Sequence, residues 1–534
     1  MRRRLILIAA TVLPLSAALA PMAANAVGTT TTGATAAGGT ACAAIPVTAP
    51  PGATVEGVRA VANPGGTVTF PDQPPLGAPA PVTDVPAFCD INVTLSHPGA
   101  GDHVTVKVSL PSDPAKWSGR LQAVGGSAYQ AGNLNGAETV TAVKNGYVAA
   151  VTDAGVSQNV LDTTWAIKPD GSLDQGLLTD FASRSLHDMT VVAKQVTKTF
   201  YGKPATYSYW NGCSTGGRQG YLEAQRYPHD YDGILANAPA INWDRFAVAT
   251  IWPAVVYNEL NVAPSACEIG AFNTAVVKAC DTLDGVKDNI IDNPQKCAWD
   301  PRTLVGTTVV CDGQTQTITK AEAEAIRKIW QGPGKLWYGP NKGADIATYL
   351  ANPAQPFFVA DNWVKYFVTR NPALDTRNLT YRDFGKLFAS SRKQFNSVIG
   401  TDDPNLRAFR DSGGKLLTWQ GQSDQLIPTQ GTVDYRNRVE RLMGGNAKVN
   451  DFYRLFLLPG VDHCQGGTGP QAVDPLGALV TWVEKGQAPA TLATATTGAD
   501  GKSITRNACP YPNVARYTGH GDPASAASYR CARA

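Results

Sequence analysis

Short apolar segments in the first half of the chain have the spacing of β-strands. Residues 91–95 and 104–110 alternate apolar and polar side chains, which predicts strands with one buried face. Residues 121–124 and 147–151 are short apolar runs, which are typical of strands buried within a parallel sheet. The pattern therefore predicts four strands in this part of the chain.

Helical spacing of apolar residues alternates with further strand-like runs. Residues 184–200 predict a helix, residues 207–210 predict a strand, and residues 216–227 predict a second helix. An alternation of strands and helices favours an α/β fold in which helices cover a central sheet.

This pattern stops after the second helix and returns at residues 415–419 and 452–458, which are again apolar strand-like runs. The intervening residues 246–404 are irregular, rich in aromatic side chains and contain four of the ten cysteines. We therefore expect an α/β core, residues 42–245 and 405–534, interrupted by a large lid domain. The second part of the core ends in a C-terminal tail, and the lid would cover the active-site end of the sheet.

The N-terminus has the parts of a signal peptide: a cluster of arginines, a short apolar run and an Ala-x-Ala site that ends at Ala26. We expect residues 1–26 to be removed and the Gly/Ala/Thr-rich residues 27–41 to form a flexible leader. A membrane anchor is the alternative, but the apolar run is short and contains Pro14 and Pro21. The sequence predicts export, by either the general or the twin-arginine route.

The composition is that of an exported protein without a nucleic-acid partner. Ten cysteines, an even number, suggest five disulfides in an oxidising compartment. No C-x-x-C pair occurs, which argues against a zinc ribbon or a thioredoxin-like site. Without the three N-terminal arginines the basic and acidic residues are equal in number, so the chain offers no electrostatic footprint for nucleic acid. We expect a small molecule or a neutral polymer as partner, and no membrane; the oligomeric state is left open.

Residues 212–216 (Gly-Cys-Ser-Thr-Gly) have the G-x-S-x-G spacing of a nucleophile elbow. They lie between a predicted strand and a predicted helix, which is the context that an elbow requires. Ser214 would then be the nucleophile, and the N–H of Thr215 would donate to an oxyanion at the helix N-terminus. Because the chain has 52 glycines, a Gly-rich turn in which Ser214 only caps the helix is the alternative.

A serine nucleophile needs a base and an acid that orients the base, in the order Ser, Asp or Glu, His on an α/β-hydrolase fold. His463 directly follows the strand-like residues 452–458, where the loop with the base belongs. His520 lies in a Gly/Pro-rich tail and is expected at the surface. Asp424 lies in the turn after residues 415–419 and is the expected acid, with capping of local N–H groups as its alternative role.

Two cysteines adjoin this predicted pair, because Cys213 directly precedes Ser214 and Cys464 directly follows His463. A disulfide between them would hold their Cα atoms about 4.4–6.8 Å apart. The nucleophile and the base would then lie side by side.

At these residues the chain resembles the tannase and feruloyl esterase family, which includes mono(hydroxyethyl) terephthalate hydrolases. The resemblance runs from about residue 42 to the end. It is carried by residues 212–220, 223–228, 232–243, 421–428 and 462–464 and by the tail from Cys509 to Cys531. The Cys-Ser and His-Cys dipeptides make it specific, since α/β-hydrolases in general do not share them.

The resemblance implies a Ser214–His463–Asp424 triad beside a Cys213–Cys464 disulfide, and a lid that supplies most substrate contacts. The other expected disulfides are Cys280–Cys297, Cys42–Cys89 and Cys509–Cys531, which leaves Cys267–Cys311.

The resemblance also implies a first oxyanion loop at residues 124–129, where glycines are usual. This chain differs from the family there, with Ser127 and Ala128. The second oxyanion donor therefore stays open among Gly126, Ser127 and Ala128, with Gly126 and Ser127 as the favoured residues.

An acidic loop at residues 280–292 has four aspartates and an Asp-Gly turn. Calcium prefers such mixtures of carboxylate and carbonyl oxygens on a tightly turning loop, although the spacing is not that of an EF-hand. A solvated acidic turn is the alternative. The resemblance implies a structural Ca²⁺ bound by the side chains of Asp281, Asp284 and Asp288 and by the carbonyls of Val286 and Ile290.

The favoured function is a secreted serine esterase that hydrolyses feruloyl- or galloyl-type esters of phenolic acids through an acyl-enzyme. A general carboxylesterase or a terephthalate monoester hydrolase on the same scaffold is the alternative. A secreted binding module without catalysis is a remote one, since all three triad residues are present. Aromatic side chains of the lid would either stack on a phenolic ring or form the lid's own core: Trp330, Trp337, Tyr338, Phe357, Phe358, Trp363, Tyr366 and Phe367.

Overall fold

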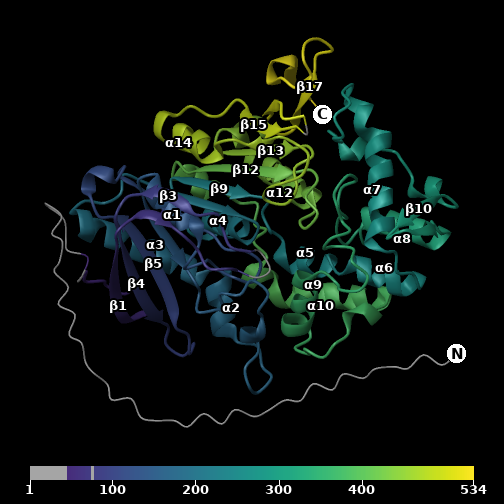
Figure 1. The fold of residues 1–534 in the computed structure, drawn as a ribbon. Coiled ribbons are helices and arrows are strands. Elements are labelled where there is room, and N and C mark those ends of the chain that lie inside the picture. Colours follow the sequence, from purple (N-terminus) through teal and green to yellow (C-terminus); the bar gives the residue numbers. More distant parts are fainter. Residues whose placement is uncertain (1–41, 43–44, 74–76, 499, 534) are drawn as a thin grey trace, which may run out of the picture. The chain divides into compact units, whose positions relative to one another are not determined.

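A nine-stranded mixed sheet is the central element of the structure (Figure 1). The computed structural model describes residue 42 and residues 45–73, 77–498 and 500–533, so the predicted signal peptide and leader lie outside the described residues. In spatial order the sheet contains β1 (Thr54–Asn63), β4 (Phe88–Ser96), β5 (Val104–Pro111), β7 (Tyr147–Thr152), β6 (Arg120–Val124), β8 (Tyr207–Cys213), β9 (Gly233–Asn237), β12 (Lys415–Gly421) and β13 (Tyr453–Leu458).

The strand directions divide the sheet into two parts. From β1 to β7 each strand is antiparallel to its neighbour, whereas the six strands from β7 to β13 are parallel. Every strand predicted from the sequence in the core is present, and all residues of β7 are buried, as expected for a strand covered on both faces. The order β5-β7-β6-β8 and the helical crossovers confirm the α/β-hydrolase core.

Helices cover both faces of the sheet. On one face lie α3 (Arg184–Tyr201), α4 (Thr215–Arg226), α12 (Thr429–Met443) and α13 (Asn446–Asn450), and on the other lie α1 (Ala137–Lys144) and α14 (Pro475–Lys485). Because side chains alternate along a strand, the neighbours Tyr209 and Trp210 of β8 contribute to opposite hydrophobic clusters. Coverage of both faces explains why most residues of the parallel strands are buried.

The insertion, residues 238–414, separates β9 from β12 and adds no strand to the sheet. It contains α5 (Trp243–Ala249), α6 (Trp252–Leu260), α7 (Ala266–Cys280), the hairpin of β10 (Thr308–Cys311) and β11 (Gln314–Thr317), α8 (Lys320–Gln331), α9 (Phe358–Asn362), α10 (Tyr381–Ile399) and α11 (Arg407–Asp411). Most of its buried apolar side chains belong to one cluster, which also includes Leu178 and Phe181 of α2 (Gln175–Ala182) and Tyr129. The insertion thus packs on the core partly through α2.

Smaller elements complete the described chain. The short strands are β2 (Gly66–Val68), β3 (Val82–Val85), β14 (Gln471–Ala472), β15 (Leu492–Thr497), β16 (Ser503–Ala508), β17 (Asn513–Tyr517) and β18 (Tyr529–Arg533). None of the helices in the described part of the chain has the length and apolar character needed to cross a membrane.

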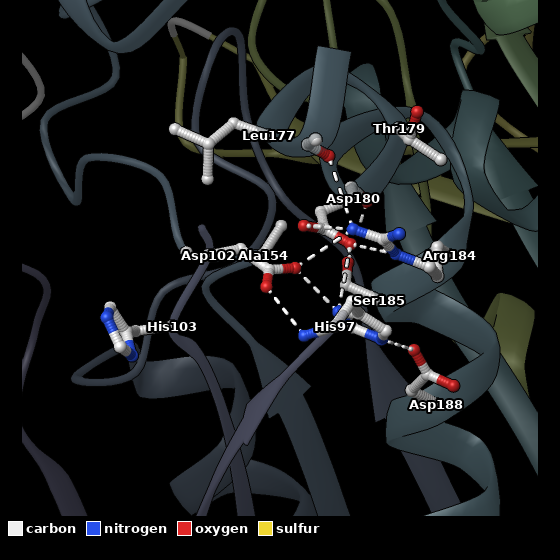
Figure 2. A network of polar contacts seen from close by, with 12 residues as sticks. His97, Asp102, His103, Ala154, Leu177, Thr179, Asp180, Arg184, Ser185 and Asp188 are labelled. Atoms are coloured by element: carbon white, nitrogen blue, oxygen red, sulfur yellow. Dashed lines mark hydrogen bonds and ion pairs between the residues drawn. The ribbon is translucent and has the colours of Figure 1, made fainter. Parts of the chain in front are cut away.

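A buried polar network ties the β4–β5 connection to α2 and α3 (Figure 2). The imidazole of His97 contacts Asp102 through Nδ1 at 2.6 Å and Asp188 through Nε2 at 3.0 Å. The Arg184 guanidinium donates to Asp102 at 2.9 Å and to both carboxylate oxygens of Asp180 at 2.6 and 2.9 Å. Sequence reasoning missed this network because its members come from three separate segments.

Charge in this network is distributed unevenly between the carboxyl groups. Burial raises the pKa of Asp180 to about 7 in spite of Arg184. At Asp102 burial acts in the same direction, but hydrogen bonds from Asp180 and His97 outweigh it and lower the pKa to about 2. Ligand atoms of His97, Asp102 and Asp180 lie within 4.8 Å of one another, but Arg184 already supplies a cation to both carboxylates. We therefore interpret the network as structural.

Candidate active site

Ser214 occupies a sharp turn between β8 and α4. Its backbone has φ 61° and ψ −120°, a conformation that costs a non-glycine residue about 1–3 kcal/mol and is common at active sites. Ser214 is the N-cap residue of α4, but its side chain makes no capping hydrogen bond.

The neighbouring glycines are required by close backbone contacts. A Cβ atom on Gly212 would lie 2.5 Å from the carbonyl carbon of Gly216, and one on Gly216 would lie 3.1 Å from the Cα of Gly125. The G-x-S-x-G spacing therefore reflects a turn that has no room for a side chain at position 212 and little room for one at position 216.

Asp424 and His463 are paired at the ends of β12 and β13. Oδ2 of Asp424 lies 2.9 Å from Nδ1 of His463, and the Asp424 side chain is fully buried. Oδ1 of Asp424 accepts from the N–H groups of Leu426 and Ile427 at 2.9 and 2.8 Å. Asp424 thus pairs with His463 through one carboxylate oxygen and accepts from local N–H groups through the other. The N–H of His463 donates to Oε1 of Gln425 at 3.0 Å, which further fixes the loop that carries the imidazole.

The disulfide between Cys213 and Cys464 brings the two halves of the site together. The two Cα atoms lie 5.9 Å apart, within the expected range. Because these cysteines adjoin Ser214 and His463, the link brings the turn that carries Ser214 close to the loop that carries His463. The other four disulfides are also those expected: Cys42–Cys89, Cys267–Cys311, Cys280–Cys297 and Cys509–Cys531.

The oxyanion loop corrects the sequence-based choice of donors. The N–H of Gly126 donates to Oε1 of Gln219 at 2.9 Å, and the N–H of Ser127 donates to the carbonyl of Gln130 at 3.0 Å. Neither Gly126 nor Ser127 is therefore free to bind an oxyanion. Within the described residues the N–H groups of Thr215 and Ala128 have no hydrogen-bond acceptor. The sequence could not reveal this difference, because it depends on Gln219 and on a local turn.

Four of the eight aromatic residues expected in the lid are buried core residues. Trp363 and Phe367 are completely buried, and Phe357 and Trp337 are nearly so. Tyr338 is 38% exposed, and it lines a cavity of about 450 Å³ that contains no residue of the expected triad. For the four buried side chains, the interpretation as ordinary lid core is the correct one.

The acidic loop follows α7 and is closed by the Cys280–Cys297 disulfide. Oδ1 of Asp281 accepts from the N–H groups of Asp288 and Asn289 at 3.0 and 2.8 Å. Burial, with repulsion from neighbouring carboxylates, raises the pKa of Asp288 to about 6, although Arg506 lies 2.8 Å away. The loop therefore concentrates negative charge in a partly buried place.

Two carbonyl groups of this loop lack partners. Val286 and Ile290 are each only 5% exposed, and in the described chain their carbonyl oxygens accept no hydrogen bond. Buried carbonyls usually have a partner, and oxygen atoms of this kind are what Ca²⁺ binds. The residue types present thus fit a calcium ion, although in the described chain no three carboxylates of the loop have oxygens within 4.8 Å of one another.

Comparisons with known proteins agree with this geometry. Residues 89–350 and 334–532 match the family described as tannase and feruloyl esterase. A probable feruloyl esterase from Arthroderma benhamiae is 44% identical over 510 residues, which cover 92% of this chain and 93% of that protein. A mono(2-hydroxyethyl) terephthalate hydrolase from Piscinibacter sakaiensis is 30% identical over 523 residues, with coverage of 85% and 86%.

A solved structure supports the same assignment. The crystal structure of feruloyl esterase B from Aspergillus oryzae superposes with a TM-score of 0.76 at 27% identity, covering 90% of this chain and 97% of that one. The sequence match, the α/β-hydrolase core with its insertion, and the elbow with its adjoining disulfide lead to one conclusion. The chain belongs to the tannase and feruloyl esterase family of carboxylic ester hydrolases.

Proposed function

We propose that this protein hydrolyses esters of phenolic carboxylic acids, using Ser214 as nucleophile, His463 as base and Asp424 as the acid that orients the base. The observation that carries the proposal is the Asp424–His463 pair, which the Cys213–Cys464 disulfide holds next to the strained Ser214. A binding module would have no need of this combination.

In the proposed reaction His463 removes the proton of Ser214 Oγ as this oxygen attacks the ester carbonyl carbon. The N–H groups of Thr215 and Ala128 stabilise the resulting oxyanion, because both lack another acceptor. The imidazolium returns its proton to the alkoxide as the ester C–O bond breaks, and an alcohol leaves. His463 then deprotonates a water molecule, which attacks the carbonyl carbon of the acyl-enzyme. The imidazolium returns this proton to Ser214 Oγ as the bond between Oγ and the acyl carbon breaks, and the acid leaves.

Asp424 acts through His463. A buried carboxylate on Nδ1 keeps the proton on that nitrogen, so that Nε2 is left as the base. It also stabilises the imidazolium that forms in each transition state.

The acyl group is inferred from the relatives. The probable feruloyl esterase is 44% identical and the terephthalate monoester hydrolase only 30% identical, which favours a feruloyl-type substrate. The alcohol side would be a small molecule or a plant polymer.

We also propose that the acidic loop binds a structural Ca²⁺ through Asp281, Asp284 and Asp288 and through the carbonyls of Val286 and Ile290. The unpartnered carbonyls support this proposal. The ion would neutralise the loop's carboxylates and stiffen the segment closed by the Cys280–Cys297 disulfide.

Export is the third part of the proposal. Five disulfides among the described residues suit an oxidising compartment. We propose that residues 1–26 act as a signal peptide and are cleaved after Ala26; this segment lies outside the described residues.

The test is release of acid from methyl ferulate, methyl gallate, mono(2-hydroxyethyl) terephthalate and p-nitrophenyl acetate by the mature enzyme and by Ser214→Ala. We expect hydrolysis of methyl ferulate that Ser214→Ala abolishes. Preference for methyl gallate or for the terephthalate ester would change the acyl group that we assign to the substrate. Preference for p-nitrophenyl acetate would indicate a general carboxylesterase. Equal activity of both proteins would refute Ser214 as nucleophile.

A further inference from the structure

Tyr129 joins the oxyanion loop to the insertion. Its side chain is completely buried, and its hydroxyl donates to the carbonyl of Val359 at 2.6 Å. Its ring is stacked on Phe367, with centroids 5.7 Å apart and an interplanar angle of 11°, and Trp243 lies edge-on at 5.8 Å. All three partners belong to the insertion, whereas Tyr129 directly follows Ala128 in the loop.

The opposite side of the loop is held by α4. The N–H of Gly216 donates to the carbonyl of Gly126 at 2.9 Å, and Gln219 accepts from the N–H of Gly126. The hydroxyl of Thr215 donates to the carbonyl of Ala128 at 2.7 Å. The loop is therefore held by α4 on one side and by the insertion on the other.

Ala128 has a strained backbone at this point. Ser127 and Gln130 close a tight turn through hydrogen bonds of 3.0 and 2.9 Å, and Ala128 and Tyr129 are its two central residues. Ala128 has φ 45°, and the first central position of such turns usually takes glycine when φ is positive. Strained residues keep their conformation only where surrounding contacts impose it. The contacts of Tyr129 with the insertion are among those that impose it here.

We propose that Tyr129 is a positioning residue for ester hydrolysis: by anchoring the loop to the insertion it aims the Ala128 N–H at the oxyanion. Correct placement of the Ala128 N–H would then depend on the position of the insertion. The inference rests on the proposed function, because it takes Ala128 as a donor. Tyr129 itself touches no reacting atom.

Two features of Tyr129 suit this role. Burial raises the pKa of its phenol well above the usual 10, so the hydroxyl remains a donor at any working pH. Its partner Val359 begins a segment that continues into the π-helical turn Trp363–Val368, which carries Phe367. Turns of this kind are rare and are often found at functional sites.

The test is Tyr129→Phe, which removes one oxygen atom and keeps the stacked ring. We expect kcat for methyl ferulate to fall about tenfold, less than the 10²–10³-fold loss of a complete oxyanion donor, with little change in KM. Affinity for a phenylboronic acid, which forms a tetrahedral adduct on Ser214, should fall by a similar factor. Active sites are counted by the burst of p-nitrophenol, so that unfolded protein does not lower kcat.

Tyr257→Phe is the matched control. The Tyr257 hydroxyl also donates from a buried position to a backbone carbonyl, that of Ala351 at 3.0 Å, but both residues belong to the insertion. We expect this variant to keep kcat and boronate affinity. Phe367→Leu, which keeps the hydroxyl bond and loosens the stacking, should shift both quantities in the same direction as Tyr129→Phe.

The inference is overturned if Tyr129→Phe keeps wild-type kcat and boronate affinity per active site and loses only thermal stability, as Tyr257→Phe would. It is also overturned if both tyrosine variants lose kcat equally. Failure of the proposed function would look different, since Ser214→Ala would then retain full activity.

Discussion

Cys213 and Cys464 are bonded to each other across 251 positions of sequence, with Cα atoms 5.9 Å apart. Each is the immediate neighbour of a residue proposed for catalysis, Ser214 or His463. Cys464, like Ser214, has a positive φ, of 62° against 61°. The bond thus joins two backbone turns, at the point where the proposed mechanism transfers a proton from Ser214 to His463.

Removal of this disulfide should reduce both stability and turnover. We expect the double variant Cys213→Ala/Cys464→Ala to lose about 2–4 kcal/mol of unfolding free energy, since the bond closes a long loop. We also expect kcat to fall at least tenfold, about 1.4 kcal/mol of barrier, because the nucleophile and base are less well oriented. Denaturant unfolding and steady-state kinetics measure the two effects.

The Cys267–Cys311 bond provides the comparison. It lies within the insertion and closes 44 positions. Its removal should lower stability but leave kcat per active site unchanged. Equal losses of kcat in the two double variants would mean that Cys213–Cys464 acts on folding alone.

Replacement of Asp424 by Asn should remove most of the activity and leave the fold unchanged. The amide retains the size of the carboxylate, but it no longer stabilises the imidazolium of His463. We expect kcat to fall about 10³–10⁴-fold with a nearly unchanged circular dichroism spectrum. Asp434→Asn on α12, which loses only a partly exposed ion pair with Arg438, is the control and should remain fully active. An active Asp424→Asn enzyme would rule out the assigned acid.

Chelation should affect stability rather than chemistry. If Ca²⁺ is bound by the acidic loop, EDTA should lower the melting temperature by several degrees, and excess Ca²⁺ should restore it. Turnover at 25 °C should change less than twofold, because the loop contributes no residue to the proposed mechanism.

Asp284→Asn should weaken this response to Ca²⁺, as measured by thermal denaturation at increasing Ca²⁺ concentrations. Asp312→Asn, in the β10–β11 turn of the same insertion, should retain the wild-type response. An EDTA-insensitive melting temperature in the metal-loaded wild type would contradict a structural calcium ion at this loop.

The buried network around Asp180 predicts a specific pH dependence of stability. The pKa of Asp180 is about 7 in the folded protein and 3.8 ordinarily, so between these values the folded state holds a proton that the unfolded state releases. The contribution of this group to stability is complete below about pH 4 and is lost as the pH rises through 7. Asp180→Asn cannot titrate, and its stability relative to wild type should therefore increase from pH 4 to pH 8.

Asp102 acts in the opposite direction. Its pKa of about 2 means that its contribution is present above about pH 4 and is lost as the pH falls toward 2. His97, Arg184 and Asp188 face the same network and remain in both proteins. Asp451→Asn, an exposed residue, is the control. A difference between Asp180→Asn and wild type that is constant with pH would show that Asp180 does not titrate in this range.

The sequence by itself determined the features that depend on local chemistry. The elbow could be recognised because strand, tight turn and helix are contiguous, and because close backbone contacts favour glycine at positions 212 and 216. The strands of the core could be recognised because half-buried strands alternate apolar and polar residues, whereas strands buried on both faces favour short apolar runs. The disulfides followed from the resemblance, whose Cys-Ser and His-Cys dipeptides are visible in the sequence.

The tertiary structure decided whatever depends on contacts between distant segments. Gly126 and Ser127 look like suitable oxyanion donors in the sequence, but Gln219 and Gln130 occupy their N–H groups, which leaves Ala128. Tyr129 and Val359 are 230 positions apart, and no local pattern indicates their hydrogen bond. Hydrogen bonds of this kind are satisfied only when the whole chain has packed, because each buried donor then takes the nearest acceptor that the fold provides.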